Sequence, residues 1–103
     1  MHMKALKRGL PPMHPGELLA DVLPATGKTI TEVADLIGIS RQMLSMIVNG
    51  HARVTPDVAA LLGKVLGNGP GLWLRLQADW DAEHIDPAIR AKVERIRTLE
   101  AVA

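Results

Sequence analysis

Apolar residues return every three or four positions along most of the chain, which is the spacing of a helix with one buried face. A further stretch, 72–80, is apolar around most of its circumference, so we expect it to be covered on two sides. The pattern predicts an all-α fold of five or six helices without a strand. The apolar stripes of the other predicted helices are Leu18, Leu19, Val22 and Leu23; Val33, Leu36 and Ile37; Leu44, Ile47 and Val48; Val58, Leu61, Leu62, Val65 and Leu66; and Ile89, Val93, Ile96 and Leu99.

Proline, glycine and hydroxyl residues mark where these helices begin and end. Pro15 suits the first position of the first helix, and Pro24 is expected to end it, because proline cannot continue the helical hydrogen bonds. Thr29 and Glu32 have the spacing of a capping box, in which each side chain satisfies the other residue's backbone amide. The remaining predicted boundaries are Ser40, Asn49-Gly50, Thr55-Pro56, Gly67, a turn at 68–71, and Asp86-Pro87.

Two of the predicted short helices, within 29–50, are joined by a tight turn. Gly38 is expected to stop the first, because a left-handed backbone is cheap only for glycine, and Ala34 is small where the two helices cross. This layout is typical of the helix-turn-helix, whose second helix enters the major groove of DNA. An ordinary helical hairpin is the alternative, but it does not require these two small residues. The positions that must be buried are all apolar: Val33, Ile37, Ile39, Leu44 and Ile47.

The second helix of this pair has a row of residues that do not face the core. Glutamine can pair bidentately with adenine, arginine with guanine or phosphate, and methionine can touch a thymine methyl group. Ser40 can donate to a phosphate as well as cap the helix, and Arg53 lies where it can reach a phosphate. A solvated surface is the alternative for each residue alone, but as a group they predict a DNA-binding row. The predicted DNA-binding residues are Ser40, Arg41, Gln42, Ser45, Met46, Asn49 and Arg53.

Composition narrows the possible classes of protein. The chain has 103 residues, enough for one small domain, and a net charge of only +1, so DNA binding must depend on where its few cations lie. It has no cysteine, which excludes disulfides and thiol chemistry. There is no nucleophile–base set, and His14 with Glu17 lacks a third metal ligand, so we expect no enzyme, cofactor or metal site. Without a membrane-spanning run or a signal peptide, we expect a cytoplasmic protein that is nucleoid-associated when bound to DNA.

The chain divides into three expected parts: a flexible basic leader at 1–12, the DNA-binding domain at 13–84 and a C-terminal helix at 85–103. A small domain buries a limited fraction of its surface, so packing against a second copy would stabilise it. The apolar 72–80 helix and the seam of the last helix suit that contact. The alternative for the last helix is to fold back on its own domain. The predicted dimer-interface residues are Leu72, Trp73, Leu76, Trp80, Ile89, Val93, Ile96 and Leu99.

Longer motifs accompany the helix-turn-helix: Met13-His14-Pro15-Gly16-Glu17-Leu18, Gly38-Ile39-Ser40-Arg41-Gln42, Ile47-Val48-Asn49-Gly50, Thr55-Pro56-Asp57 and Trp73-Leu74-Arg75-Leu76-Gln77. Through them residues 13–81 resemble the HigA family of antitoxins, within the phage-repressor-like (XRE or Cro/cI type) helix-turn-helix proteins. Ile30 departs from the family pattern, because many relatives have a phosphate-bracing glutamine there. So does Gly69-Pro70-Gly71-Leu72, where relatives often have Ser-Pro-Glu-Phe.

The resemblance implies five helices around the helix-turn-helix and a homodimer. It also implies that the protein neutralises a toxin resembling RelE or HigB, an endonuclease that cleaves mRNA on the ribosome, and that it represses its own operon by binding a palindromic operator. Two alternatives stay open: a stand-alone repressor without a toxin, and an interaction scaffold that does not bind DNA. A small basic reading frame next to this gene would favour the antitoxin over the stand-alone repressor.

Overall fold

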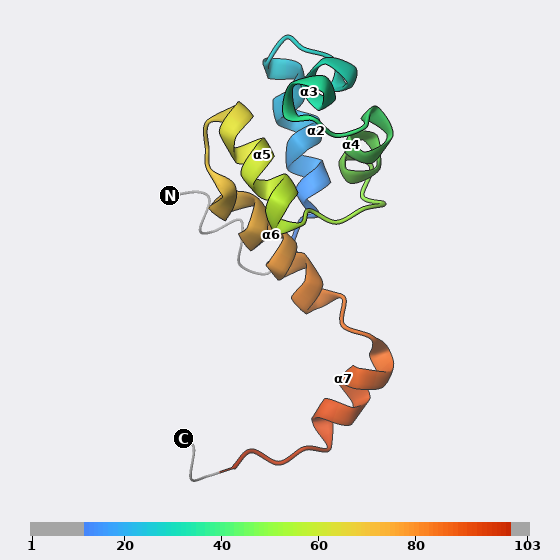
Figure 1. The fold of residues 1–103 in the computed structure, drawn as a ribbon. Coiled ribbons are helices and arrows are strands. Elements are labelled where there is room, and N and C mark those ends of the chain that lie inside the picture. The colour runs from blue at the N-terminus through green and yellow to red at the C-terminus, as the bar shows by residue number, and fades with distance from the viewer. Residues whose placement is uncertain (1–11, 100–103) are drawn as a thin grey trace.

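The computed structural model describes residues 12–99, which form six α-helices and no strand (Figure 1). The all-α prediction is therefore confirmed. Apart from Pro12, the predicted basic leader lies outside the described residues. The helices are α2 (Pro15–Ala25), α3 (Ile30–Ile37), α4 (Arg41–Val48), α5 (Pro56–Leu66), α6 (Pro70–Glu83) and α7 (Pro87–Glu94).

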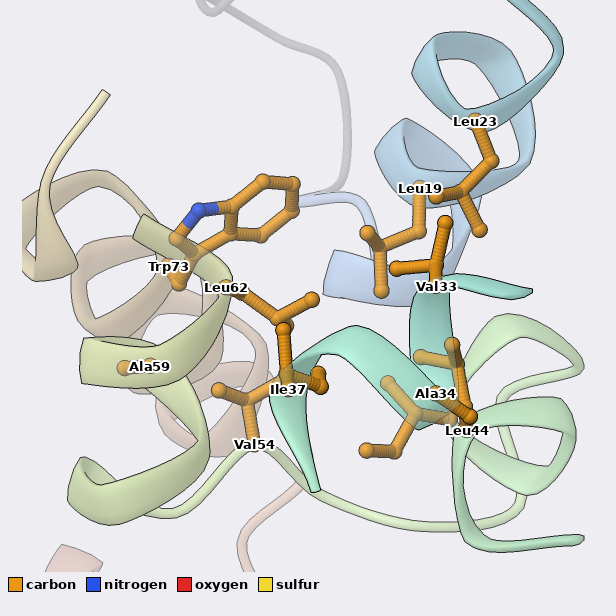
Figure 2. Close-up of a cluster of buried hydrophobic side chains, with 11 residues drawn as sticks. Leu19, Leu23, Val33, Ala34, Ile37, Leu44, Val54, Ala59, Leu62 and Trp73 are labelled. Atoms are coloured by element: carbon orange, nitrogen blue, oxygen red, sulfur yellow. The ribbon is translucent and has the colours of Figure 1, made fainter. Parts of the chain in front are cut away.

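Helices α2 to α6 surround one hydrophobic core, which Figure 2 shows. Its members are aliphatic except for Trp73, the largest fully buried side chain. The indole Nε1 of Trp73 donates to Oδ1 of Asn68 at 3.0 Å, so the buried ring keeps a partner for its one polar atom. The buried core residues are Leu19, Leu23, Val33, Ala34, Ile37, Leu44, Ile47, Val54, Ala59, Leu62 and Trp73.

The predicted capping box at the start of α3 is confirmed. The amide of Glu32 donates to Oγ1 of Thr29 at 3.1 Å, and the amide of Thr29 donates to Oε1 of Glu32 at 2.8 Å. These hydrogen bonds hold the pKa of the Glu32 carboxyl below its ordinary value. A second box, at the start of α2, joins His14 to Glu17: Nδ1 of His14 accepts from the amide of Gly16 at 2.9 Å, and its own amide donates to Glu17 at 3.1 Å.

Two predicted helix boundaries are wrong by one or two residues. Helix α2 continues past Pro24 to Ala25. Proline has no amide hydrogen to donate within the helix, but the amide and hydroxyl of Thr26 close the last turn by donating to the carbonyl of Leu23 at 3.0 and 2.6 Å. Helix α6 begins at Pro70 rather than at Leu72, because proline at the first position loses no helical hydrogen bond.

Helix α6 is buried along one stripe only. Trp73 and Gln77 are its buried residues, whereas Leu72, Leu74 and Leu76 are half-buried. The helix packs mainly against α5 and to a smaller extent against α2. Within one chain, the prediction that this stretch is covered on two sides is therefore not met.

Helix α7 extends away from the other helices (Figure 1). It begins where predicted, with Oδ1 of Asp86 accepting from the amide of Ala88 at 2.8 Å, but it ends at Glu94. The amide of Arg95 donates to Lys92 and that of Ile96 to Val93, both at 3.1 Å, and these three-residue bonds close the last turn. The predicted four-residue seam is thus wrong, because Ile96 and Leu99 lie beyond the helix.

The alternative in which the last helix folds back is not met either. No residue of α7 is buried, and none of the helices α2 to α6 packs extensively against it. Its one hydrogen bond to the preceding helix within residues 12–99 runs from Nη2 of Arg90 to the carbonyl of Glu83, at 3.3 Å. No helix in this range is long and apolar enough to span a bilayer.

The start of α2 lies directly against the end of α4. A β-carbon on Gly16 would fall 2.7 Å from the carbonyl oxygen of Val48 and closer still to that of Ile47. Both neighbours are backbone atoms, so they cannot move aside as the tip of a side chain can. This approach requires glycine at position 16, a demand that is not visible in the chain's apolar pattern.

We predict that Gly16→Ala destabilises the fold by about 1–3 kcal/mol, the usual cost of overpacking a rigid contact. Gly71→Ala is the control, because a β-carbon there would meet only the end of the Arg75 side chain, with Nη1 at 3.0 Å. That change should be neutral or should stabilise α6 by up to about 1 kcal/mol. Urea unfolding of both variants measures the difference, and equal stabilities would contradict the close approach at Gly16.

Candidate nucleic-acid interface

The turn between α3 and α4 fixes the direction in which α4 leaves the core. Gly38 has φ = 77°, the left-handed conformation that was predicted for it. Its amide and that of Ile39 both donate to the carbonyl of Ala34, at 2.9 and 3.1 Å, and Ala34 is completely buried. Oγ of Ser40 accepts from the amide of Met43 at 3.0 Å and so caps α4. Two small residues and one hydroxyl therefore set the orientation of the second helix.

Helix α4 buries Leu44 and Ile47 and presents its other side to solvent. The structure brings the predicted row together on that side: Arg41, Gln42, Met46 and Asn49 are exposed, as is the capping Ser40, and Ser45 is half-buried. Nδ2 of Asn49 donates to Oγ of Ser45 at 3.4 Å, one helical turn away. Met43 is also exposed beside this row, and the sequence pattern assigned it neither to the core nor to DNA.

Arg53, the predicted phosphate contact in the loop after α4, is bound to a carboxylate of α6. Its Nη1 and Nη2 donate to Oδ1 and Oδ2 of Asp81, at 3.2 and 2.7 Å. The guanidinium holds the pKa of the Asp81 carboxyl below its ordinary value. These residues lie 28 positions apart, so no local sequence signal predicts that they meet.

Gln77 carries a structural role that sequence reasoning missed. Its side chain is buried, and its Oε1 accepts from the amide of Val54 at 2.7 Å. Its Nε2 donates to Oδ1 of Asp81 at 2.9 Å. The Val54 amide lies in the loop between α4 and α5 and is shielded from solvent, so it needs a hydrogen-bond partner within the protein, and Gln77 provides it. The loop that follows the exposed row is tied to α6.

Comparison with known proteins identifies the family of this chain. The helix-turn-helix family model matches residues 25–74. Virulence-associated protein A of Dichelobacter nodosus is 36% identical over 89 residues, which cover 84% of this chain and 87% of that protein. The chain belongs to the XRE-type helix-turn-helix family.

Other members of this helix-turn-helix family are named as antitoxins or were solved with DNA. Antitoxin HigA-1 of Vibrio cholerae is 36% identical over 64% of this chain and 63% of its own. A structure described as an antidote protein of a plasmid maintenance system, from Nostoc punctiforme, is 38% identical with a TM-score of 0.73, covering 87% of this chain and 99% of that one. PA4674 of Pseudomonas aeruginosa, solved with its operator DNA, is 26% identical with a TM-score of 0.77, over 85% and 99% of the two chains.

The second helix of a helix-turn-helix, here α4, is the recognition helix. Its end, at Val48 and Asn49, borders a pocket that is also lined by His14 and Trp80. The ring of His14 contacts that of Trp80 edge-on, with centroids 5.2 Å apart, and Trp80 stacks on His84 at 3.7 Å. Burial lowers the pKa of His14, which favours the neutral ring whose Nδ1 caps α2. Residues 12–99 contain no group of three or more acidic or histidine side chains placed to bind a metal.

The predicted dimer-interface residues of this helix-turn-helix chain fall into three environments. Trp73 is wholly buried in the core of its own chain, so its prediction as an interface residue is wrong: no surface of it remains for a partner. On α6, Leu72, Leu76 and Trp80 are half-buried. Ile89, Val93, Ile96 and Leu99 are exposed on and beyond α7.

Proposed function

We propose that this chain is the antitoxin of a toxin–antitoxin pair and represses its own operon by binding a palindromic operator. The observation that carries the proposal is the exposed polar row of α4, held in the helix-turn-helix by Ala34 and Gly38. Relatives solved on operator DNA, among them PA4674, support the DNA part. The names of HigA-1 and of the Nostoc antidote protein support the antitoxin part.

In this proposal the first turn of α4 reads bases. Arg41 and Gln42 are both exposed there and make no hydrogen bond through their side chains to another residue in 12–99. Their donors and acceptors are free to pair bidentately with guanine and adenine edges in the major groove. Ser45, Met46 and Asn49 continue the same surface along the helix, and Ser40 donates to the flanking phosphate.

We predict that Arg41→Ala or Gln42→Ala costs about 1–3 kcal/mol of binding free energy on the operator and little on random DNA. The region upstream of the gene supplies the operator fragment, and a mobility-shift titration measures both affinities. Arg75→Ala, which removes the same side chain from an exposed position on α6, is the control and should leave operator affinity unchanged. An equal loss on both DNAs for Gln42→Ala would show that Gln42 does not read bases.

The homodimer is part of the proposal, because one recognition helix covers few base pairs and a two-fold pair reads half-sites about 34 Å apart. Five aliphatic side chains at the C-terminal end support a surface for the second copy: Ile85, Ile89, Val93, Ile96 and Leu99 are between 44% and 70% exposed. Burying each is worth roughly 1.5–3 kcal/mol. On α6, Leu72, Leu76 and Trp80 are half-buried and stay part of the proposed interface.

We predict that the protein is a dimer at micromolar concentration and that Ile89→Asp shifts it towards monomer and weakens operator binding. Ala91→Asp, which adds the same charge on the opposite side of α7, is the matched control and should stay dimeric. Sedimentation velocity gives the assembly state, and circular dichroism checks that both variants remain helical. A monomeric unmodified protein would rule out the dimer.

The toxin is the third component of the proposal, after the operator and the second copy. We expect a small basic ribonuclease resembling RelE or HigB that binds away from Arg41, Gln42 and Ser45. The protein should then hold toxin and operator together. Co-expression with the product of the neighbouring gene, followed by copurification and a shift assay on the upstream DNA, tests this expectation.

Strict competition between toxin and operator would contradict a separate toxin surface. Operator binding without any copurifying partner would instead support the stand-alone repressor. Unchanged mobility of the operator fragment at low salt would support the scaffold that does not bind DNA.

A further inference from the structure

Helix α6 holds the loop after the recognition helix at two neighbouring residues. The amide of Val54 is bound by Gln77, and the guanidinium of Arg53 is bound by Asp81, one helical turn further along α6. Gln77 and Asp81 are also bonded to each other, at 2.9 Å. The four residues form one continuous hydrogen-bonded chain from a buried amide to an exposed cation.

The buried end of this chain determines the orientation of the exposed end. The amide of Val54 can only donate, so the Gln77 side chain must present its oxygen to it and its nitrogen to Asp81. That nitrogen donates to Oδ1 of Asp81 and holds the carboxylate in place. Asp81 can then accept both Nη groups of Arg53 in a bidentate pair.

Stability alone gives little reason for this ion pair. The side chains of Arg53 and Asp81 are 58% and 41% exposed, and an exposed ion pair contributes little to stability because water and salt screen it. The pair does, however, compensate a cation in the loop that leaves the recognition helix. The chain has 12 lysines and arginines against 11 acidic residues, so attraction to DNA depends on which cations near the recognition helix are left uncompensated.

We propose that Asp81 is an intramolecular counter-ion that competes with DNA phosphate for Arg53 and so limits the affinity of the protein for DNA of any sequence. The proposal rests on the proposed DNA-binding function. To contact phosphate, Arg53 must leave the carboxylate or bring it close to another negative group, and both cost binding energy. Because phosphate contacts carry no sequence information, the cost falls equally on operator and random DNA. Because Asp81 weakens only the phosphate contact, base contacts contribute a larger fraction of the total binding free energy.

The test uses Asp81→Asn in the full chain. Asparagine keeps an oxygen that can accept from Gln77, so the buried end of the hydrogen-bonded chain is preserved while the charge is removed. We expect affinity to rise about threefold to tenfold on both operator and random DNA, with a salt slope steeper by about 0.9 for each bound protomer, the contribution of one phosphate contact. The double variant Arg53→Ala with Asp81→Asn should bind no tighter than Arg53→Ala alone.

Asp79→Asn is the matched control, because Asp79 is exposed on the same helix and forms no ion pair with a residue in 12–99. It removes the same charge without releasing Arg53, and its affinity should change by less than about twofold, as expected for a screened charge. Equal gains from the two variants would overturn the proposal in favour of a general charge effect. A gain that persists without Arg53 would overturn it too. Weaker binding by Asp81→Asn would show that Asp81 positions Arg53 for DNA rather than competing for it.

Elution from a heparin column separates this inference from the proposed function. Heparin is a polyanion without bases, so it reports the availability of Arg53 even if no operator is bound. Asp81→Asn should elute at higher salt than Asp79→Asn, and coincident elution would overturn the competition. Failure of the unmodified protein to shift its operator, together with the expected order on heparin, would refute the operator proposal alone.

Discussion

The fold depends on the contact between the first turn of α2 and the last turn of α4. There the backbone of Gly16 lies directly against the carbonyl groups of Ile47 and Val48. Only glycine at position 16 allows the two backbones to come this close. The His14 ring caps α2 at the same place and contacts the ring of Trp80 of α6 edge-on. The end of α4 is therefore held by α2 directly and by α6 through the His14 ring, whereas the turn at Gly38 orients its start.

In the proposed role, most discrimination must come from a small surface with little charge. Arg41 is the cation of the exposed row on α4, and Arg53 is compensated by Asp81. A protein of this kind gains little from long-range attraction to DNA and more from contacts that depend on the base sequence. Pairing two copies then adds the base contacts of the second copy, while the charge of each copy stays the same.

Features with a local cause were predicted correctly from the sequence. The box of Thr29 and Glu32, the left-handed Gly38 and the cap by Ser40 each depend on partners within four residues. The exposed row on α4 followed in turn, because the spacing of Leu44 and Ile47 determines which side of the helix is buried.

Features that depend on distant residues could not be predicted in this way. Gln77 lies 23 positions from the amide it satisfies, and the steric demand on Gly16 comes from the end of α4. Trp73 and Trp80 share a helix face, yet only Trp73 is in the core, because burial along α6 decreases towards its C-terminal end. The apolar spacing of the last helix continues to Leu99, but the helix ends at Glu94. The spacing indicates which side of a helix is apolar, and it does not indicate where the helical hydrogen bonds stop.

The separation of α7 from the other helices has an evolutionary consequence. Its exposed face shares no side chain with the core and lies apart from the helix that is oriented by Ala34 and Gly38. A lineage can therefore exchange the residues of that face without changing how the core orients α4, and in the proposed dimer such an exchange changes only how two copies pair. Gln77 and Asp81 have no such freedom, since each serves α6 and the loop after α4 at once. Selection can therefore act on the packing of the core and on the pairing of two copies as separate properties, with α6 as the segment where their histories are coupled.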